Sequence, residues 1–293
     1  MATRELPSAP SMPAMFARAG ARTIPGAGHL PLVGRGGRDV PELTLRLTDV
    51  KVDRARVADY DRVCGFALRD ALPATYPHML AFPLQLSLMT DPSFPFGAIG
   101  LVHISNRITH HRPIRAAELL QIDVWATPIE DHAAGKQFSL RSEVRASDEL
   151  VWEEVSTNLK RGKGAGANRG SEATLPRAQD LPATATWTLS GDLGRRYGAV
   201  SGDYNPIHIH PFSARLFGFP SAIAHGMWTK ARCVAALEPQ LPRSFTVDVA
   251  FRRPIPLPGK VEFCERGTAA GIDFGVRDPA KGKSHLDGRV IFA

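Results

Sequence analysis

Residues 197–208 read Tyr-Gly-Ala-Val-Ser-Gly-Asp-Tyr-Asn-Pro-Ile-His, and the rest of the chain is organised around them. The stretch holds two proton carriers, Asp203 and His208, and an apolar run at residues 222–237 follows it. Pro206 holds the residue before it in extended backbone, so the chain turns and lets the two side chains converge. The stretch therefore predicts a carboxyl group and an imidazole held together in front of a buried helix.

A second copy of this pattern lies earlier in the chain. Residues 60–65 match residues 197–202, because both stretches begin with tyrosine and end with glycine. Two more anchors follow in the same order: Pro73 and His78 match Pro220 and His225, and His111-Arg112-Pro113-Ile114 matches Arg252-Arg253-Pro254-Ile255. A repeated order of anchors indicates two copies of one structural unit.

The pattern of apolar residues predicts the same elements in both copies, a strand, then helices, then a sheet, which is an α+β class. In the first copy we expect a strand at 43–47, a helix capped by Asp53, a helix at 78–90 kinked by Pro83, and strands near 99–107, 119–127, 137–146 and 150–159. In the second copy we expect a strand at 184–189, a short helix ending at Ser201, a helix at 222–237, and strands near 245–252, 260–266, 271–277 and 285–292.

These elements divide the chain into an N-terminal arm (1–40), a first repeat (41–160), a linker (161–182) and a second repeat (183–293). The linker is rich in glycine and proline and carries almost no large apolar residues. The arm is rich in Arg, Gly, Pro and Ala, which superficially resembles an organelle transit segment. Because Pro and Gly interrupt any long amphipathic helix there, we expect a partly ordered arm instead.

The two copies differ where the chemistry lies. From the glycine to the matching proline the first copy has eight positions (65 to 73) and the second has eighteen (202 to 220). The ten additional residues fall in the segment that holds Asp203 and His208, and Phe66 takes the place of Asp203 in the first copy. Only the second copy keeps the proton carriers. We expect the first to be a scaffold that widens a binding groove, against which the substrate tail lies.

Composition places the chain among globular proteins. With 293 residues, of which 43% are hydrophobic, it can bury a sizeable core. The chain lacks an apolar run of about 18 residues, so we predict no membrane span. Three scattered cysteines, Cys64, Cys233 and Cys264, fit a reducing compartment, and we expect a cytoplasmic protein. The net charge of +7 is dispersed, which argues against a nucleic-acid partner and is compatible with an anionic small molecule.

A carboxylate beside an imidazole suits chemistry on water. Adding water to a polarised double bond needs one group to take a proton from water and another to move a proton to the neighbouring carbon. It also needs donors for the developing enolate oxygen. Asp203 and His208 can share the first two tasks. The backbone N–H of Gly226 can supply the third if the turn before Met227 opens the helix.

Blander interpretations of the same residues stay open at this point. Asp followed by Tyr-Asn-Pro is also an ordinary turn or capping sequence. His208 and His210, with His225 downstream, resemble a metal-ligand cluster, but a spaced cysteine or further carboxylate is missing, so we predict no metal. His78 and His225 lie at equivalent helix starts, which favours a shared structural role. Motifs for nucleotide binding and for a serine nucleophile do not occur.

Residues 197–214 resemble the hydratase motif of the MaoC-like, (R)-specific enoyl-CoA hydratase family. The matching positions are an aromatic residue, then Val200, Ser201, Gly202, Asp203, any residue, Asn205, Pro206, Ile207, His208 and Ala214. Downstream, Phe219-Pro220 and Ile223-Ala224-His225-Gly226-Met227 resemble that family as well. The length and the order of the two copies resemble its double hot-dog subgroup, in which a degenerate N-terminal copy accompanies a catalytic C-terminal one.

The resemblance implies a long central helix wrapped by an antiparallel sheet in each copy, and an acyl-thioester groove at their junction. It implies a hydro-lyase of fatty acid metabolism, which carries out syn hydration of a trans-2-enoyl thioester to the (R)-3-hydroxyacyl thioester, reversible as dehydration. No metal or redox cofactor is implied. The implied site consists of Asp203 and His208 on the water, Asn205 positioning them, Gly226 donating its N–H to the thioester oxygen, and Tyr204, His225 and Met227 near the substrate.

Rival functions and several properties stay open. The rivals are an acyl-thioester binding module without turnover and a thioesterase on the same architecture. The partner is an acyl thioester of coenzyme A or of acyl carrier protein, which present the same phosphopantetheine arm. Two copies in one chain permit a monomeric pseudo-dimer, and a homodimer is equally compatible. The sequence does not specify acyl chain length.

Overall fold

The computed structural model describes residues 2–23, 36–164 and 175–293, which form two compact units. Unit 1 comprises Met1–Val52, Pro77–His103 and Ala117–Ser171. Unit 2 comprises Asp53–Tyr76, Ile104–Ala116 and Glu172–Ala293. Each unit is thus assembled from segments that lie far apart in the sequence, and unit 2 contains both of the matched Tyr-to-Gly stretches.

Unit 1 is built on a sheet that is antiparallel except at one edge, where β1 runs parallel to β2. The strand order is β1-β2-β4-β6-β7, with β5 paired to β6. Buried and exposed residues alternate along β6 and β7, as expected of strands with one face on a core. The bounds are Ala2–Glu5 (β1), Leu43–Val50 (β2), Leu120–Ala126 (β4), Glu130–His132 (β5), Gly135–Ala146 (β6) and Glu149–Arg161 (β7).

Helix α3 (Pro77–Met89) lies against β4 and β6 and is apolar on nearly every side, with Pro83 inside it as expected. Its polar residues are buried with partners: Gln85 Nε2 donates to Ser142 Oγ (2.9 Å) and to Glu154 Oε2 (2.8 Å). His78 Nδ1 lies 2.7 Å from Glu154 Oε1. Beside α3 lies α1 (Met12–Ala21), which buries Met15 and Ala19.

Unit 2 is built on an antiparallel sheet with the strand order β3-β9-β12-β11-β10-β8. Its helices are α2 (Arg54–Cys64), α4 (Leu193–Ser201), α5 (Pro206–Ile209), α6 (Pro211–Leu216) and α7 (Gly226–Leu237). Two short 3-10 turns are η2 (Ala178–Asp180) and η3 (Glu238–Gln240). The strand bounds are Val102–His110 (β3, in unit 2 from Ile104), Ala183–Leu189 (β8), Phe245–Phe251 (β9), Gly259–Thr268 (β10), Gly271–Arg277 (β11) and Ser284–Phe292 (β12).

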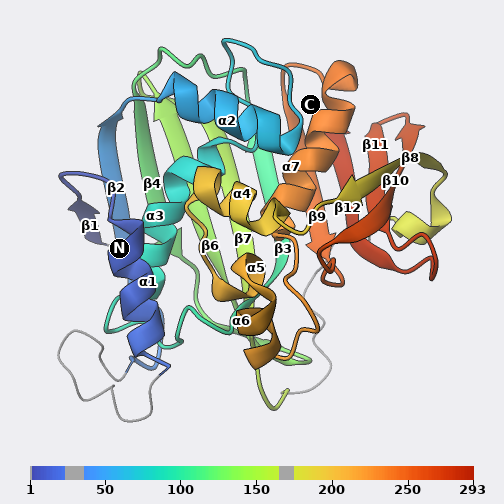
Figure 1. The fold of residues 1–293 in the computed structure, drawn as a ribbon. Coiled ribbons are helices and arrows are strands. Elements are labelled where there is room, and N and C mark those ends of the chain that lie inside the picture. The colour runs from blue at the N-terminus through green and yellow to red at the C-terminus, as the bar shows by residue number, and fades with distance from the viewer. Residues whose placement is uncertain (1, 24–35, 165–174) are drawn as a thin grey trace. The chain divides into compact units, whose positions relative to one another are not determined.

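The central helix of unit 2 is α7, which lies against β3 and β9 (Figure 1). Lys230, which is fully buried, fastens it there by donating from Nζ to the carbonyl oxygens of Asn106 in β3 (3.0 Å) and Val247 in β9 (3.1 Å). Trp228 Nε1 donates to the carbonyl oxygen of Val63 in α2 (3.0 Å). The start of α7 is therefore held from both sides.

The two matched stretches lie side by side in unit 2, on α2 and α4 (Figure 1). Tyr60 and Tyr197 are buried, with ring centroids 6.3 Å apart. Each helix ends at a glycine in the left-handed region, Gly65 with φ 83° and Gly202 with φ 77°, which glycine adopts without steric cost. The predicted cap of α2 is confirmed, since the carboxylate of Asp53 accepts from the first N–H groups of the helix.

Most predicted elements are confirmed with ends shifted by a few residues. The helix expected from residue 222 begins only at Gly226, because Ile223 bridges Pro256 and the N–H of Ala224 donates to Ile255, which keeps this segment extended. The equivalence of His78 and His225 is wrong in detail. His78 is the second residue of α3, whereas His225 precedes the first residue of α7.

Sequence reasoning missed the short elements β1, α1, β5, α5 and α6. The repeat boundaries stay a prediction, since the predicted linker at 161–182 falls partly on residues 165–174, outside the described residues. Just after that gap, Leu175, Ala178 and Leu181 are buried.

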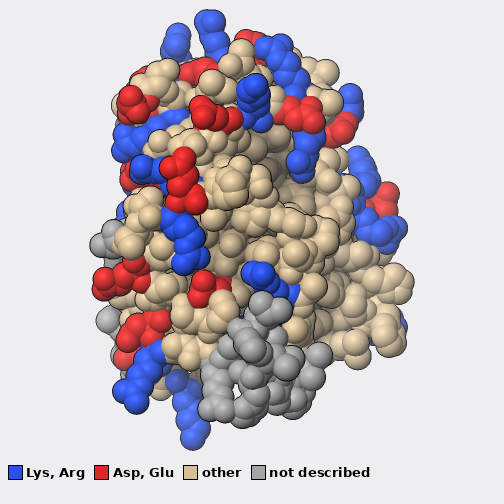
Figure 2. Space-filling view, turned by 90° about the vertical axis from the view of Figure 1, so that its left-hand side faces the viewer, with Lys and Arg blue, Asp and Glu red and all other residues tan. Residues whose placement is uncertain are grey.

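The described surface in Figure 2 carries Lys and Arg interspersed with Asp and Glu, and the basic side chains there do not form one continuous patch. The dispersed charge expected from the sequence is thus seen on this face. Among the described residues, every helix is too short or too polar to cross a membrane.

Candidate active site

The end of α4 places Asp203. Because Gly202 turns the chain out of the helix, Asp203 follows it directly, and its N–H donates to Ser201 Oγ (3.1 Å). The N–H of Asn205 donates to Asp203 Oδ1 (3.1 Å). Asp203 is thus held by its main chain and by its side chain, while the side chain stays 27% exposed and open to a small molecule.

The one-turn helix α5 places His208. Asn205 caps this helix through its side chain, which accepts from the N–H of Ile207, and Pro206 occupies the first turn, where its missing N–H costs nothing. His208 Nδ1 lies 2.7 Å from the carbonyl oxygen of Ile223. A carbonyl oxygen only accepts, so Nδ1 carries the hydrogen, and the neutral ring keeps its lone pair on Nε2.

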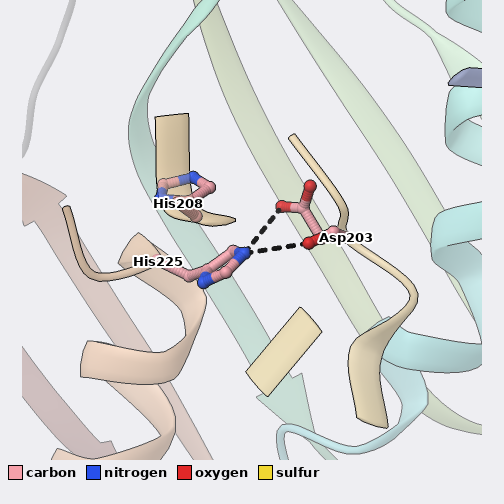
Figure 3. Close-up of side chains that lie close together, drawn as sticks. All are labelled: Asp203, His208 and His225. Atoms are coloured by element: carbon pink, nitrogen blue, oxygen red, sulfur yellow. Dashed lines mark hydrogen bonds and ion pairs between the residues drawn. The ribbon is translucent and has the colours of Figure 1, made fainter. Parts of the chain in front are cut away.

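His225 completes a cluster of three side chains, which come from the loop after α4, from α5 and from the residue before α7 (Figure 3). Its Nε2 donates to the carbonyl oxygen of Asp203 (3.0 Å) and lies 3.8 Å from Asp203 Oδ2. The rings of His208 and His225 are stacked, with centroids 3.7 Å apart, and Tyr197 contacts His225 at 4.8 Å. The three predicted residues Asp203, His208 and His225 therefore meet at one point.

Burial keeps both imidazoles neutral. It lowers the pKa of His208, and the nearby Asp203 carboxylate and the Ile223 carbonyl only partly oppose this. It holds the pKa of His225 well below the ordinary value, and the neighbouring His208 adds to this effect, while the Asp203 carbonyl opposes it. A neutral His208 beside a partly exposed carboxylate has a free lone pair and can act as a general base toward a bound molecule.

The predicted donor to the enolate oxygen is the backbone N–H of Gly226, which follows His225 in the chain. Gly226 is the first residue of α7, and the preceding His225 side chain does not cap the helix, so the first N–H groups are not satisfied by a capping side chain. A side chain at Gly226 would meet the ring of Phe251 at 3.0 Å, so only glycine fits without a shift. Met227 follows and is buried, whereas Tyr204 is 48% exposed beside Asp203.

The donor atoms of Asp203, His208 and His225 lie within 4.8 Å of one another, a spacing that a divalent cation would have to tighten. The hydrogen on His225 Nε2 is already directed at the Asp203 carbonyl. The arrangement therefore suits acid–base chemistry better than cation binding.

Sequence reasoning missed the group that orients His208. The carbonyl of Ile223 fixes its tautomer, and a backbone carbonyl has no signature in the sequence. Ser201 was identified only as a position of the motif, and in the structure its hydroxyl accepts from the N–H of Asp203. The stacking of two imidazoles seventeen residues apart (208 to 225) was also not anticipated, because it arises only when α5 packs on the start of α7.

Comparison with known proteins identifies a matching domain family and a similar protein. Residues 173–262 match the family model described as MaoC like domain. The chain is 34% identical over 264 residues to 3-hydroxyacyl-thioester dehydratase X of Mycobacterium tuberculosis, covering 90% of this chain and 94% of that protein.

Solved structures agree. The crystal structure of HtdX from M. tuberculosis superposes with a TM-score of 0.75 at 34% identity, over 84% of this chain and 98% of that one. A conserved hypothetical protein of the same organism, described as having a double hot-dog fold, superposes with a TM-score of 0.52 at 14% identity, over 87% of this chain and 95% of that one. The expected fold class is confirmed, and the chain belongs to the MaoC-like dehydratase family.

Proposed function

We propose that this protein catalyses the reversible hydration of trans-2-enoyl thioesters to (R)-3-hydroxyacyl thioesters. The observation that carries the proposal is the meeting of Asp203 and His208 with His225, the residue that precedes the first residue of α7 (Figure 3). Membership of the MaoC-like family, with a relative named 3-hydroxyacyl-thioester dehydratase X, supports the same reaction. The enzyme is a hydro-lyase.

In the hydration direction, Asp203 and His208 hold one water molecule. The water oxygen bonds to C3 of the enoyl group, and the π electrons of the C2–C3 double bond shift toward the thioester oxygen. His208 Nε2, which carries the free lone pair, and the Asp203 carboxylate take the proton from water and deliver one to C2. Since water provides both the hydroxyl and the hydrogen, atoms and charge balance without a co-reactant, and addition from one side is syn.

Negative charge develops on the thioester oxygen during this step. In this proposal the N–H of Gly226, the first residue of α7, donates to that oxygen, because a helix N-terminus offers unpaired N–H groups and a favourable dipole. Asn205 positions Asp203 through its own N–H and begins the helix that carries His208. Tyr204 and Met227 complete the proposed surroundings of the substrate, and His225, expected there as well, contacts Asp203 and His208.

The carrier is coenzyme A or acyl carrier protein, whose shared phosphopantetheine arm reaches the site in either case. A monomeric pseudo-dimer and a homodimer both suit a chain with two repeats. A cytoplasmic location is also proposed, and it agrees with the three cysteines, which are all free thiols and buried.

Chiral product analysis across enoyl-CoA chain lengths tests the function. We expect crotonyl-CoA and longer enoyl-CoA substrates to give (R)-3-hydroxyacyl-CoA, with the preferred length set by the groove. Release of free thiol from acyl-CoA, with no 3-hydroxy product, would identify a thioesterase instead. Saturable binding without any product would identify a binding module.

A further inference from the structure

His225 is the most enclosed member of the catalytic cluster. Its side chain is 2% exposed, whereas that of Asp203 is 27% exposed. One contact is the stacked ring of His208 and another is Tyr197. A side chain so covered has little surface left for a substrate, so its effect must pass through its neighbours.

The hydrogen bonds of His225 determine where its proton lies. Nε2 carries the hydrogen because it donates to the carbonyl oxygen of Asp203, so Nδ1 of the neutral ring holds the lone pair. Nδ1 is buried and has no hydrogen-bond partner among the described residues. A second proton there would create a buried cation without an acceptor, which is strongly unfavourable.

Three groups face the ring of His225. From α5 the facing group is His208, which must accept a proton during the reaction, and from α4 it is Tyr197. From the loop after α4 it is Asp203, through its carbonyl at 3.0 Å and its carboxylate at 3.8 Å. A cation at His225 would repel the protonated state of His208 and draw the Asp203 carboxylate away from the water.

We infer that His225 is a positioning residue, an imidazole that stays neutral while it fixes the Asp203 main chain and covers one face of the His208 ring. The inference rests on the proposed function, since it assigns His225 a task in the same reaction. His225 keeps Asp203 and His208 at a constant separation while protons move between them and the substrate. Burial of its ring is part of this task.

The variant His225→Gln separates the two tasks. The glutamine amide can still donate to the Asp203 carbonyl, but the ring that covers His208 is lost. We expect kcat for crotonyl-CoA to fall about tenfold with KM changed less than about threefold, because catalysis depends on placement more than binding does. Water then reaches His208, so the acid limb of the kcat/KM profile moves to higher pH by about half a unit or more.

The matched control is His210→Asn, which replaces a histidine of the same segment that only caps α6 with its Nδ1. Asparagine caps helices well, so rate and pH profile are expected to match the wild type. A rise in KM alone in His225→Gln would overturn the inference and make His225 a substrate contact. An unchanged rate and acid limb would overturn it as well.

A titration of the wild-type protein by NMR, without substrate, tests the same inference independently of turnover and of any variant. We expect the His225 ring signals to show no titration between about pH 5 and pH 9, while His208 titrates below its ordinary pKa. Titration of His225 within this range would refute a permanently neutral role. If instead the wild type forms no hydration product, the proposed function fails, and the titration still decides the state of His225.

Discussion

The ends of α2 and α4 are two versions of one structure, and they differ in where the carboxyl group lies. Both helices bury a tyrosine and end at a left-handed glycine. Directly after the glycine, the first version has Phe66, which is buried and stacks on Tyr60 at 6.2 Å. The second version has Asp203. The same local structure therefore carries a packed apolar side chain in one case and a carboxylate of the proposed acid–base site in the other.

A second residue difference between α2 and α4 makes room for the segment that follows α4. Asp61 in α2 corresponds to Gly198 in α4, and a side chain at Gly198 would meet the Asp203 carbonyl at 3.1 Å and Ile209 at 3.2 Å. The glycine thus makes room for the ten additional residues that carry α5 and His208. A catalytic copy needs both the added segment and a small residue beneath it.

Replacing His208 by glutamine is expected to have the largest effect in this set. The variant keeps a polar side chain of similar reach but cannot take up a proton, so kcat/KM for crotonyl-CoA should fall by roughly 10²- to 10⁴-fold. The first copy lacks this residue, so the change brings the second copy closer to the first. A folded variant, with an unfolding midpoint close to that of the wild type, that keeps more than a tenth of the activity would contradict the role of His208.

The C-cap glycines of α2 and α4 offer a matched pair of alanine variants, and we expect a smaller loss of activity from them than from the His208 variant. Alanine in the left-handed region costs about 1–2 kcal/mol, so Gly202→Ala and Gly65→Ala should lower the free energy of unfolding in urea to a similar extent. In Gly65→Ala the new methyl group meets only the end of the flexible Arg232 side chain at 2.9 Å, so activity should be kept. In Gly202→Ala the strain acts directly on Asp203.

We expect kcat of Gly202→Ala to fall by roughly 10- to 100-fold, since small displacements of a catalytic group are costly. Kinetics of both variants with the same substrate check this. Equal losses of kcat in the two variants would show that the ends of α2 and α4 contribute alike to the reaction.

Asp61→Asn is expected to have the smallest effect and acts on stability alone. Burial, together with the nearby Glu238, raises the pKa of Asp61 to about 6, and its Oδ1 is buried without a hydrogen-bond partner among the described residues. A raised folded-state pKa means that the ionised form destabilises the protein, so stability from this group is lost as pH rises through about 6. The asparagine variant removes that cost.

We therefore expect Asp61→Asn to be more stable than the wild type by about 1 kcal/mol at pH 8, a value reduced because solvent screens the nearby charges. The difference should shrink as pH falls from 6 and vanish only well below the ordinary pKa of 3.8, where the folded and the unfolded wild type both carry the proton. Urea unfolding at several pH values measures it. A stabilisation that is the same at pH 4 and pH 8 would show that Asp61 does not titrate as described.

Much of the comparison between α2 and α4 could be predicted from the sequence, because the relevant patterns involve residues that are close together in the chain. The helix cap at Asp53, the terminal glycines and the alternation along the strands each depend on residues within one element. The convergence of Asp203 and His208 was predicted from Pro206, which turns the chain between them, and the structure shows Asn205 and Pro206 opening the helix that carries His208.

The parts that could not be predicted depend on packing between elements. The Ile223 carbonyl reaches His208 only because the segment before α7 stays extended along Pro256. That same bridge moved the start of α7 to Gly226, four residues later than apolar content suggested. The enclosure of His225 likewise arises from α4, α5 and α7 together, and a histidine in the sequence carries no mark of it.

The most direct test of the central claim is the rate and chirality of crotonyl-CoA hydration by Asp203→Asn, with Asp61→Asn as the matched carboxyl variant. Wild type and Asp61→Asn should form the (R)-3-hydroxy product at similar rates, whereas Asp203→Asn should lose roughly 10²-fold or more of kcat/KM. Hydration by Asp203→Asn at the wild-type rate, in a protein that remains folded, would contradict the claim that the second copy carries the chemistry.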